Sequence, residues 1–276
     1  MLYMNPVPAE FATGQYYDKE GAEYYLSPAK LESDYSPVRF ERELRLFRKY
    51  CQAGDVLDVG CGSGAFLYQL NAKFVGAYRV LGTDVSGAPL DYAESKGVPV
   101  TRGPFLDQSF HGRKFDAVTM WAVAEHLLEP AKFLQKISML LQPAGVCIML
   151  VPNMKSLAVR ILGTSYRYIY SQHLNYFTAL TLAKLVEPWF RPIAFQYLHF
   201  NPAVIWQDWR SGGAEVSNAE RGQLLKQTTA YKEKAAMKPI KVAYRMVERL
   251  LGALALTDNV AIVMSPLHAE ACPATR

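Results

Sequence analysis

Apolar, β-branched runs alternate with amphipathic segments through most of the chain. Short runs of this kind, bounded by glycine, proline or aspartate, are typical of buried strands. They predict strands at residues 56–59, 78–86, 98–101, 115–121, 146–151, 193–200 and 258–264. Apolar residues spaced three or four apart predict helices at residues 66–70, 91–96, 131–141 and 178–187. Repeated strand–helix units in this order indicate an α/β fold built on a doubly wound, mostly parallel sheet.

Two further regions lie outside this alternation. The N-terminal region is rich in tyrosine, including Tyr16 and Tyr17, and ends in an amphipathic helix at residues 38–50. The tyrosines either pack at the edge of the sheet or form an aromatic lid over a cofactor, since tyrosine combines a flat apolar face with a polar tip. Residues 211–256 are charged and largely helical, with an interruption at Pro239. We therefore predict a cap or lid at residues 1–50 and a core at residues 51–200. A helical insertion at residues 201–257 would cover substrate or mediate dimerisation, and residues 258–276 would form a final strand with its tail.

Composition narrows the class of protein. The chain has 276 residues and a formal charge of +5, which a mildly basic surface explains as well as an acidic substrate does. No stretch approaches ~20 uninterrupted apolar residues, so no membrane span is predicted. The first residues lack the basic and apolar regions of a signal peptide. The four cysteines have no CxxC spacing, so we expect reduced thiols, no zinc and a cytoplasmic protein.

The segment from Val56 to Phe66 carries the most specific chemistry. An apolar strand runs into Asp58-Val59-Gly60-Cys61-Gly62-Ser63-Gly64, and an amphipathic helix follows. Glycine allows positive φ and a close approach of ligand to backbone, and a helix N-terminus presents unpaired N–H groups. The third glycine comes one residue too early for the G-x-G-x-x-G dinucleotide turn, and no Lys-Ser/Thr follows to make a P-loop. The pattern indicates a nucleotide-like ligand of another kind.

A second acidic position, Asp84, ends the next predicted strand. A carboxylate there can accept hydrogen bonds from both hydroxyls of a ribose. Asp84 can alternatively cap the following helix. Ser86 can cap that helix alone, which would leave Asp84 free for a nucleoside.

The stretch from Asp58 to Gly64 resembles motif I of class I S-adenosylmethionine (SAM) methyltransferases, and the resemblance extends over roughly residues 36–200. Three other segments are similar to the group around the ubiquinone-biosynthesis O-methyltransferase. They match its Asn-Pro-Leu-Arg-Leu, Glu-His-x-x-Asp/Glu-Pro and His-Leu-x-x-Phe-Thr patterns, and they are Ser36-Pro37-Val38-Arg39-Phe40, Glu125-His126-Leu127-Leu128-Glu129-Pro130 and His173-Leu174-Asn175-Tyr176-Phe177-Thr178. The resemblance implies a Rossmann-like sheet of seven strands, the last of them antiparallel.

The resemblance also implies SAM as the cofactor. Position by position, the residues that would contact its methionine, ribose and adenine parts are Arg39, Asp58, Gly60, Cys61, Gly62, Asp84, Val85, Phe105, Leu106 and Trp121. One departure is Pro104, which stands where relatives commonly have aspartate. The adenine amino group must therefore meet the backbone of Phe105 and Leu106 or the side chain of Asp107.

Methyl transfer from a sulfonium is chiefly a matter of positioning, because the leaving thioether is already activated. A hydroxyl acceptor also favours a general base, and the candidates are His173, His126 and Glu125. His173 is the first choice, since its loop follows the fifth strand on the side where substrates bind in such sheets. Glu125 and His126 can equally be a capping pair. Tyr176 would orient the acceptor or pack.

We therefore expect O-methylation of a small molecule such as a quinol, a sugar or a secondary metabolite. No complete metal-ligand set is visible, although Glu125 and His126 leave metal dependence open. Methylation of nitrogen or of a nucleic acid such as tRNA is an alternative, with weak support from Arg160 and Arg167. The signatures of base methylation and a separate basic domain are absent, so nucleic acid is not the expected partner. A SAM-binding partner protein without catalysis, or a homodimer joined through the helical insertion, is also compatible with the sequence.

Overall fold

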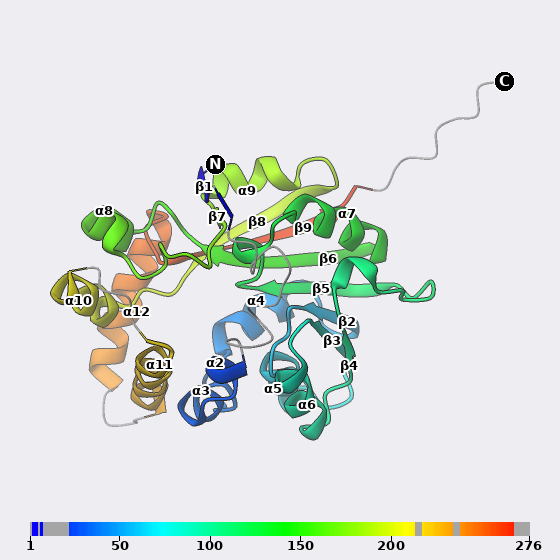
Figure 1. Ribbon diagram of the computed structural model, residues 1–276, viewed down its shortest axis with the longest axis horizontal. Helices are drawn as coiled ribbons and strands as arrows, with labels where there is room; N and C mark the ends of the chain where they lie inside the picture. Colours follow the sequence, from blue (N-terminus) through cyan, green and yellow to red (C-terminus); the bar gives the residue numbers. More distant parts are fainter. Residues whose placement is uncertain (1, 5, 8–21, 213–216, 234–237, 268–276) are drawn as a thin grey trace.

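The computed structural model describes residues 2–4, 6–7, 22–212, 217–233 and 238–267, and the predicted lid residues Tyr16 and Tyr17 lie outside this part (Figure 1). One sheet organises the described chain, in the strand order β4-β3-β2-β5-β6-β9-β8. Its strands are β2 (Gly54–Val59), β3 (Tyr78–Asp84), β4 (Val100–Arg102), β5 (Phe115–Trp121), β6 (Leu141–Pro152), β8 (Phe190–Leu198) and β9 (Asn259–Pro266). A separate pair joins β1 (Leu2–Tyr3) to β7 (Asn175–Tyr176).

Strand directions confirm the predicted fold class. The pairs among β2, β3, β4, β5 and β6 are all parallel, while β9 runs antiparallel to both of its neighbours, β6 and β8. Val56 of β2 lies opposite Val80 of β3 and Ala117 of β5. The sheet is therefore doubly wound and mostly parallel, with an antiparallel last strand.

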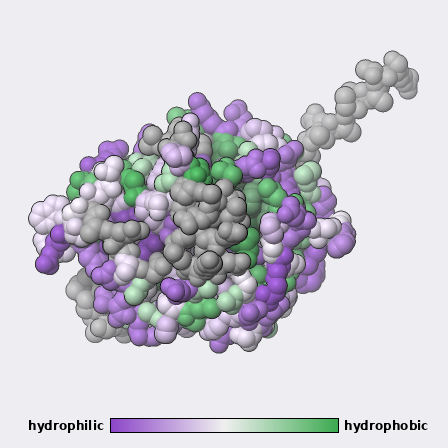
Figure 2. Space-filling model, viewed as in Figure 1, coloured by the Kyte–Doolittle hydropathy of each residue, from purple (hydrophilic) through white to green (hydrophobic). Residues whose placement is uncertain are grey.

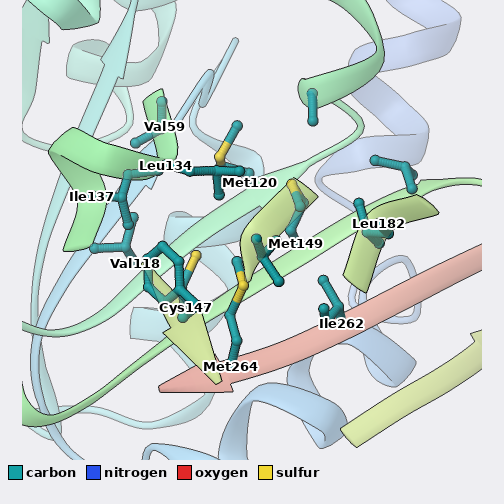
Figure 3. Close-up of a cluster of buried hydrophobic side chains, with 14 of the residues drawn as sticks. Val59, Val118, Met120, Leu134, Ile137, Cys147, Met149, Leu182, Ile262 and Met264 are labelled. Carbon is teal, nitrogen blue, oxygen red and sulfur yellow. The ribbon is translucent and has the colours of Figure 1, made fainter. Parts of the chain in front are cut away.

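Two helical layers cover the faces of the sheet (Figure 1). Alternate residues of each buried strand point to opposite faces, so Val56 joins the core beneath one layer and Leu57 the core beneath the other. One layer consists of α4 (Glu41–Tyr50), α5 (Ala65–Lys73) and α6 (Gly87–Ser95), and the other of α7 (Pro130–Leu140) and α9 (Ala179–Val186). Figure 3 shows the second core, where Leu134, Ile137 and Leu182 of these helices meet side chains of β5, β6 and β9.

Helix starts show how local sequence sets the boundaries. The helix predicted at residues 178–187 is α9; Thr178 is its N-cap, and the Thr178 side chain accepts a hydrogen bond from the backbone N–H of Thr181 in a capping box. The expectation for α6 was wrong: Ser86 occupies the N-cap position, but its side chain makes no capping hydrogen bond. The N3 residue is Pro89, which has no N–H for the Ser86 hydroxyl to accept from. Asp84 accepts the backbone N–H of Ser86 at 3.0 Å.

The remaining helices gather at one end of the sheet and along its lower side in Figure 1. They are α2 (Ala22–Tyr25), α3 (Pro28–Asp34), α8 (Leu157–Leu162), α10 (Pro202–Ser211), α11 (Asn218–Glu233) and α12 (Lys238–Ala253). In the described residues no helix is long and apolar enough to cross a bilayer. The coloured surface in Figure 2 mixes hydrophilic and hydrophobic residues.

Candidate functional site

A cleft of about 1380 Å³ opens at the carboxyl ends of the central strands. Open α/β sheets bind ligands at this edge. The glycine turn after β2 and the loop after β5 form one part of its wall, and the segment after β6 forms another. Helices α2, α4, α11 and α12 close the rest. A single space therefore joins the glycine turn to the three predicted bases.

Backbone geometry explains the glycines of the turn. Gly60, Gly62 and Gly64 have φ angles of 75°, 52° and 74°, a region that side chains rarely tolerate. A Cβ on Gly60 would lie 2.5 Å from Cγ2 of Val123, and one on Gly64 would lie 2.8 Å from Cβ of Ala93. At Gly62 the nearest neighbour would be the Tyr25 ring, at 3.4 Å. The turn is thus packed against the protein at Gly60 and Gly64 and covered by an aromatic ring at Gly62.

Of the two predicted acidic residues, Asp84 binds the turn and Asp58 joins β2 to β5. Buried Asp58 accepts a hydrogen bond from Oγ1 of Thr119 at 2.6 Å, and burial raises the pKa of Asp58 to about 7. Asp84 accepts the backbone N–H of Gly62 at 2.8 Å. Burial also raises the pKa of Asp84, against the hydrogen bonds it receives. Asp84 is therefore tied to the turn and to the start of α6 at once.

Three other predicted cofactor residues also line the cleft, namely Arg39, Cys61 and Trp121. The indole N–H of Trp121 is buried and has no hydrogen-bond partner among the described residues. Its ring lies 4.9 Å from that of Phe66. Arg39 lies 3.4 Å from the buried carboxylate of Asp34. A buried donor without an acceptor is costly unless a ligand supplies one, so Trp121 fits a polar ligand in this cleft.

The predicted adenine residues lie elsewhere. Phe105 is buried among aromatic rings in η2 (Phe105–Asp107), and Nζ of Lys136 donates to the carbonyls of Phe105 and Leu106 at 2.6 and 2.9 Å. The Val85 side chain is 39% exposed. Val85, Phe105, Leu106 and Asp84 are not among the residues that line the cleft. Their adenine and ribose contacts stay predictions.

The three candidate bases come together although they arise from two segments. Glu125 and His126 lie in η3 (Ala124–His126), directly after β5, and His173 lies before β7. The rings of His126 and His173 are 4.7 Å apart between centroids. Glu125 is 1% exposed, and neither of its carboxyl oxygens has a hydrogen-bond partner in the described chain. Burial raises the pKa of Glu125 to about 8.

Both imidazoles are held by backbone carbonyls. Nδ1 of His126 lies 2.9 Å from the carbonyl of Gln172, and Nδ1 of His173 lies 2.8 Å from that of Tyr168. A carbonyl only accepts, so each Nδ1 carries the hydrogen and each Nε2 the lone pair. Burial lowers the pKa of His126 to about 4 and that of His173 well below its ordinary value. The pair is therefore neutral at neutral pH.

Three potential metal ligands result from this arrangement. One ligand atom each from Glu125, His126 and His173 lies within 4.8 Å of the others. Two neutral imidazoles and a carboxylate are a donor set that suits a divalent transition-metal ion. The sequence pattern showed only two of the three, because His173 is distant along the chain.

Further residues at the cleft carried no sequence signal. Tyr170 and Tyr168 line it beside His173, and Arg221 reaches it from α11. The Arg221 guanidinium lies 4.5 Å from the Tyr170 ring centroid. Predicted Tyr176 lies in β7 outside the lining and donates its hydroxyl to the Tyr170 carbonyl at 3.2 Å. Arg221 belongs to no motif, and only the tertiary structure brings it here.

Sequence comparison relates the chain to known methyltransferases. A family described as a methyltransferase domain matches residues 35–188. The ubiquinone biosynthesis O-methyltransferase of Actinobacillus pleuropneumoniae is 34% identical over 124 residues, which cover 40% of this chain and 52% of that protein. The protein of the same name from Cereibacter sphaeroides is 28% identical over 158 residues, 52% of this chain and 60% of that one. The chain thus spans about half the length of the curated relatives it matches.

Solved structures share the architecture. A SAM-dependent methyltransferase from Archaeoglobus fulgidus aligns with a TM-score of 0.55 and 20% identity, over 89% of this chain and 98% of that one. Coclaurine N-methyltransferase aligns with a TM-score of 0.57 and 14% identity, over 96% and 84%. The [4+2]-cyclase SpnF aligns with a TM-score of 0.58 and 14% identity, over 94% and 97%. At these identities the likeness shows the fold alone.

Proposed function

The chain belongs to the methyltransferase-domain family, and from that membership we propose that it transfers a methyl group from SAM to a hydroxyl oxygen of a small molecule. SAM-dependent methyl transfer is the activity of this family, and the hydroxyl acceptor is our proposal. One observation carries it: the cleft that contains the glycine turn also contains a buried carboxyl group, that of Glu125, which has no hydrogen-bond partner among the described residues.

The cofactor would lie along the glycine turn. Gly60, Cys61 and Gly62 leave room for a ligand against the backbone, and the Tyr25 ring stands over Gly62. Trp121 would donate its unpaired indole N–H to the bound molecule. Bound SAM supplies an activated methyl group, so the protein has to position an acceptor in line with it.

Glu125 is the base that we favour. A general base works best when its pKa lies near the working pH, and the pKa of Glu125 is raised to about 8. The pKa values of both histidines are lowered by burial. Glu125 would take the proton that the acceptor hydroxyl loses as its oxygen gains the methyl group and the methyl–sulfur bond of SAM breaks. His173, with its tautomer fixed by the Tyr168 carbonyl, orients the acceptor through Nε2. This assignment reverses the order expected from sequence, where His173 came first.

The test is a methyl-transfer screen with labelled SAM over small hydroxylated acceptors, using wild type and Glu125→Gln. The substitution keeps the size of the side chain but cannot accept a proton. We expect turnover to fall by ~10²- to 10⁴-fold, while calorimetry shows unchanged SAM affinity. In wild type, turnover should rise about tenfold per pH unit below 8 and level off above it, since only the ionised carboxylate is a base.

Glu129→Gln is the matched control, because Glu129 is exposed and pairs with Lys132 at 2.7 Å outside the cleft. Equal turnover by Glu125→Gln and wild type would exclude Glu125 as the base. If the screen yields methylated amines and no methylated hydroxyls, the proposed acceptor is wrong.

A further inference from the structure

Arg221 is a cation in the cleft wall without an acidic partner. It is half-buried on α11, and no carboxylate of the described residues lies within ion-pair distance of it. Three other half-buried arginines are ion-paired, Arg39 with Asp34, Arg42 with Glu248 and Arg167 with Asp208. A fourth, Arg48, instead donates hydrogen bonds to the Gln52 carbonyl and the Tyr78 hydroxyl. Arg48 does not line the cleft, so among the described residues Arg221 is the half-buried arginine of the cleft wall that lacks an ion pair.

The groups around Arg221 are neutral. Its guanidinium lies 4.5 and 5.9 Å from the ring centroids of Tyr170 and Tyr24, and it donates a hydrogen bond to the Tyr170 side chain. Burial is the main cause that lowers the pKa of His126 and of His173, and the positive charge of Arg221 lowers both pKa values further. Aromatic faces attract a guanidinium, but they do not neutralise its charge.

The position of Arg221 is fixed by the packing of α11. Gly222, next to it, faces Ser27 so closely that a Cβ there would lie 3.3 Å from Oγ. About two turns further on, Oγ1 of Thr229 lies 2.6 Å from Oγ of buried Ser33. A cation held rigidly in a cleft loses little freedom when it binds an anion. The arrangement is therefore preorganised for a ligand.

We propose that Arg221 binds a carboxylate of the acceptor, so that the substrates are hydroxylated organic acids. This inference rests on the proposed function, because it concerns the acceptor of the same cleft. A guanidinium matches a planar carboxylate with two parallel hydrogen bonds. A single unpaired charge balances a monoanion better than a doubly charged phosphate.

The cofactor's own carboxylate is the competing ligand. Arg221 lies beside Tyr170, and its charge acts on His173, the residue proposed to orient the acceptor. The glycine-turn side of the cleft has its own donors in Arg39 and Trp121. The acceptor is therefore the ligand that we assign to Arg221.

Calorimetry in the presence of S-adenosylhomocysteine tests this without turnover. The probes are 3,4-dihydroxybenzoate, 4-hydroxyphenylacetate and 4-hydroxycinnamate, each compared with its methyl ester. Wild type should bind at least one acid ~10- to 100-fold more tightly than its ester. Arg221→Gln should abolish that preference by weakening the acid alone, and Arg221→Lys should retain part of it. Arg210→Gln, an exposed arginine of α10 outside the cleft, should behave as wild type.

Three results would overturn the inference. In the first, wild type binds acid and ester equally or binds no acid. In the second, Arg221→Gln loses the same affinity for the acid and for the ester. In the third, Arg221→Gln binds SAM more weakly but keeps its preference for the acid. If the melting temperature of Arg221→Gln differs from that of wild type, this variant is misfolded, and the binding of acid and ester by Arg221→Lys decides the test. Tight acid binding without methylation in the labelled-SAM screen would contradict the proposed function and leave the anion site in place.

Discussion

The two halves of the cleft are built in different ways. On the cofactor side, the glycine turn is a continuous stretch of chain, and the φ angles of Gly60, Gly62 and Gly64 determine its shape. On the acceptor side, Glu125, His173 and Arg221 come from three distant segments, and only packing brings them together. The first half depends on backbone conformation, whereas the second depends on side-chain chemistry. Substitutions on the two sides should therefore separate cofactor affinity from turnover and acceptor affinity.

Gly60→Ala should have the largest effect on cofactor affinity. Its Cβ would lie 2.5 Å from Cγ2 of Val123, so the turn must shift. We expect SAM affinity by calorimetry to fall by ~100-fold, equivalent to ~2.7 kcal/mol. Gly76→Ala is the matched control, since Gly76 has the same φ of 75° but nothing within 4 Å of a new Cβ. It should change the free energy of unfolding and leave SAM affinity within about twofold of wild type. Equal losses of SAM affinity in Gly60→Ala and Gly76→Ala would mean that the strain of a positive φ, and not the close approach at the turn, weakens SAM binding.

On the acceptor side, the buried Glu125 predicts a pH dependence of stability. Its pKa is raised in the folded protein to about 8 from 4.5, so between these values the folded state holds a proton that the unfolded state releases. The free energy of unfolding should therefore fall as pH rises from 4.5 to 8, with this group contributing at most ~1.4 kcal/mol per pH unit. Urea titrations at several pH values should give a shallower slope for Glu125→Gln than for wild type. Identical slopes would show that the carboxyl is not buried in neutral form.

The sequence predicted the two halves unequally. Strand alternation at Val56 and Leu57 and the capping box at Thr178 are local patterns, so the sheet and its helices followed from them. Motif I identified the glycine turn in the same way. The capping by Ser86 failed because the N3 residue of α6 is Pro89, which has no N–H to donate to the Ser86 hydroxyl. Arg221 could not be found, since an arginine in a charged helix has no signature until α11 is packed against Ser27 and Ser33.

His173→Asn should reduce turnover by about tenfold, the effect of losing one hydrogen bond of ~1.4 kcal/mol. The asparagine amide can replace Nδ1 as donor to the Tyr168 carbonyl, so the loop is retained while Nε2 is removed. SAM affinity should stay unchanged. His111→Asn is the control, because His111 is exposed and outside the cleft, and asparagine tolerates its φ of 49°. A loss of 10²-fold or more would instead identify His173 as the base.

The smallest expected effect lies where the cap meets the cofactor half. The Tyr25 ring is the nearest neighbour of a Cβ built on Gly62, so it would cover a ligand bound at the turn. Tyr25→Ala should weaken SAM binding about threefold, because it removes an apolar contact worth ~0.7 kcal/mol. Tyr25→Phe keeps the ring and should bind SAM as wild type does. If Tyr25→Phe is as weak as Tyr25→Ala, the hydroxyl rather than the ring covers the cofactor. If neither variant differs from wild type, α2 packs against the core without closing the site, and the cofactor side depends on the glycine turn alone.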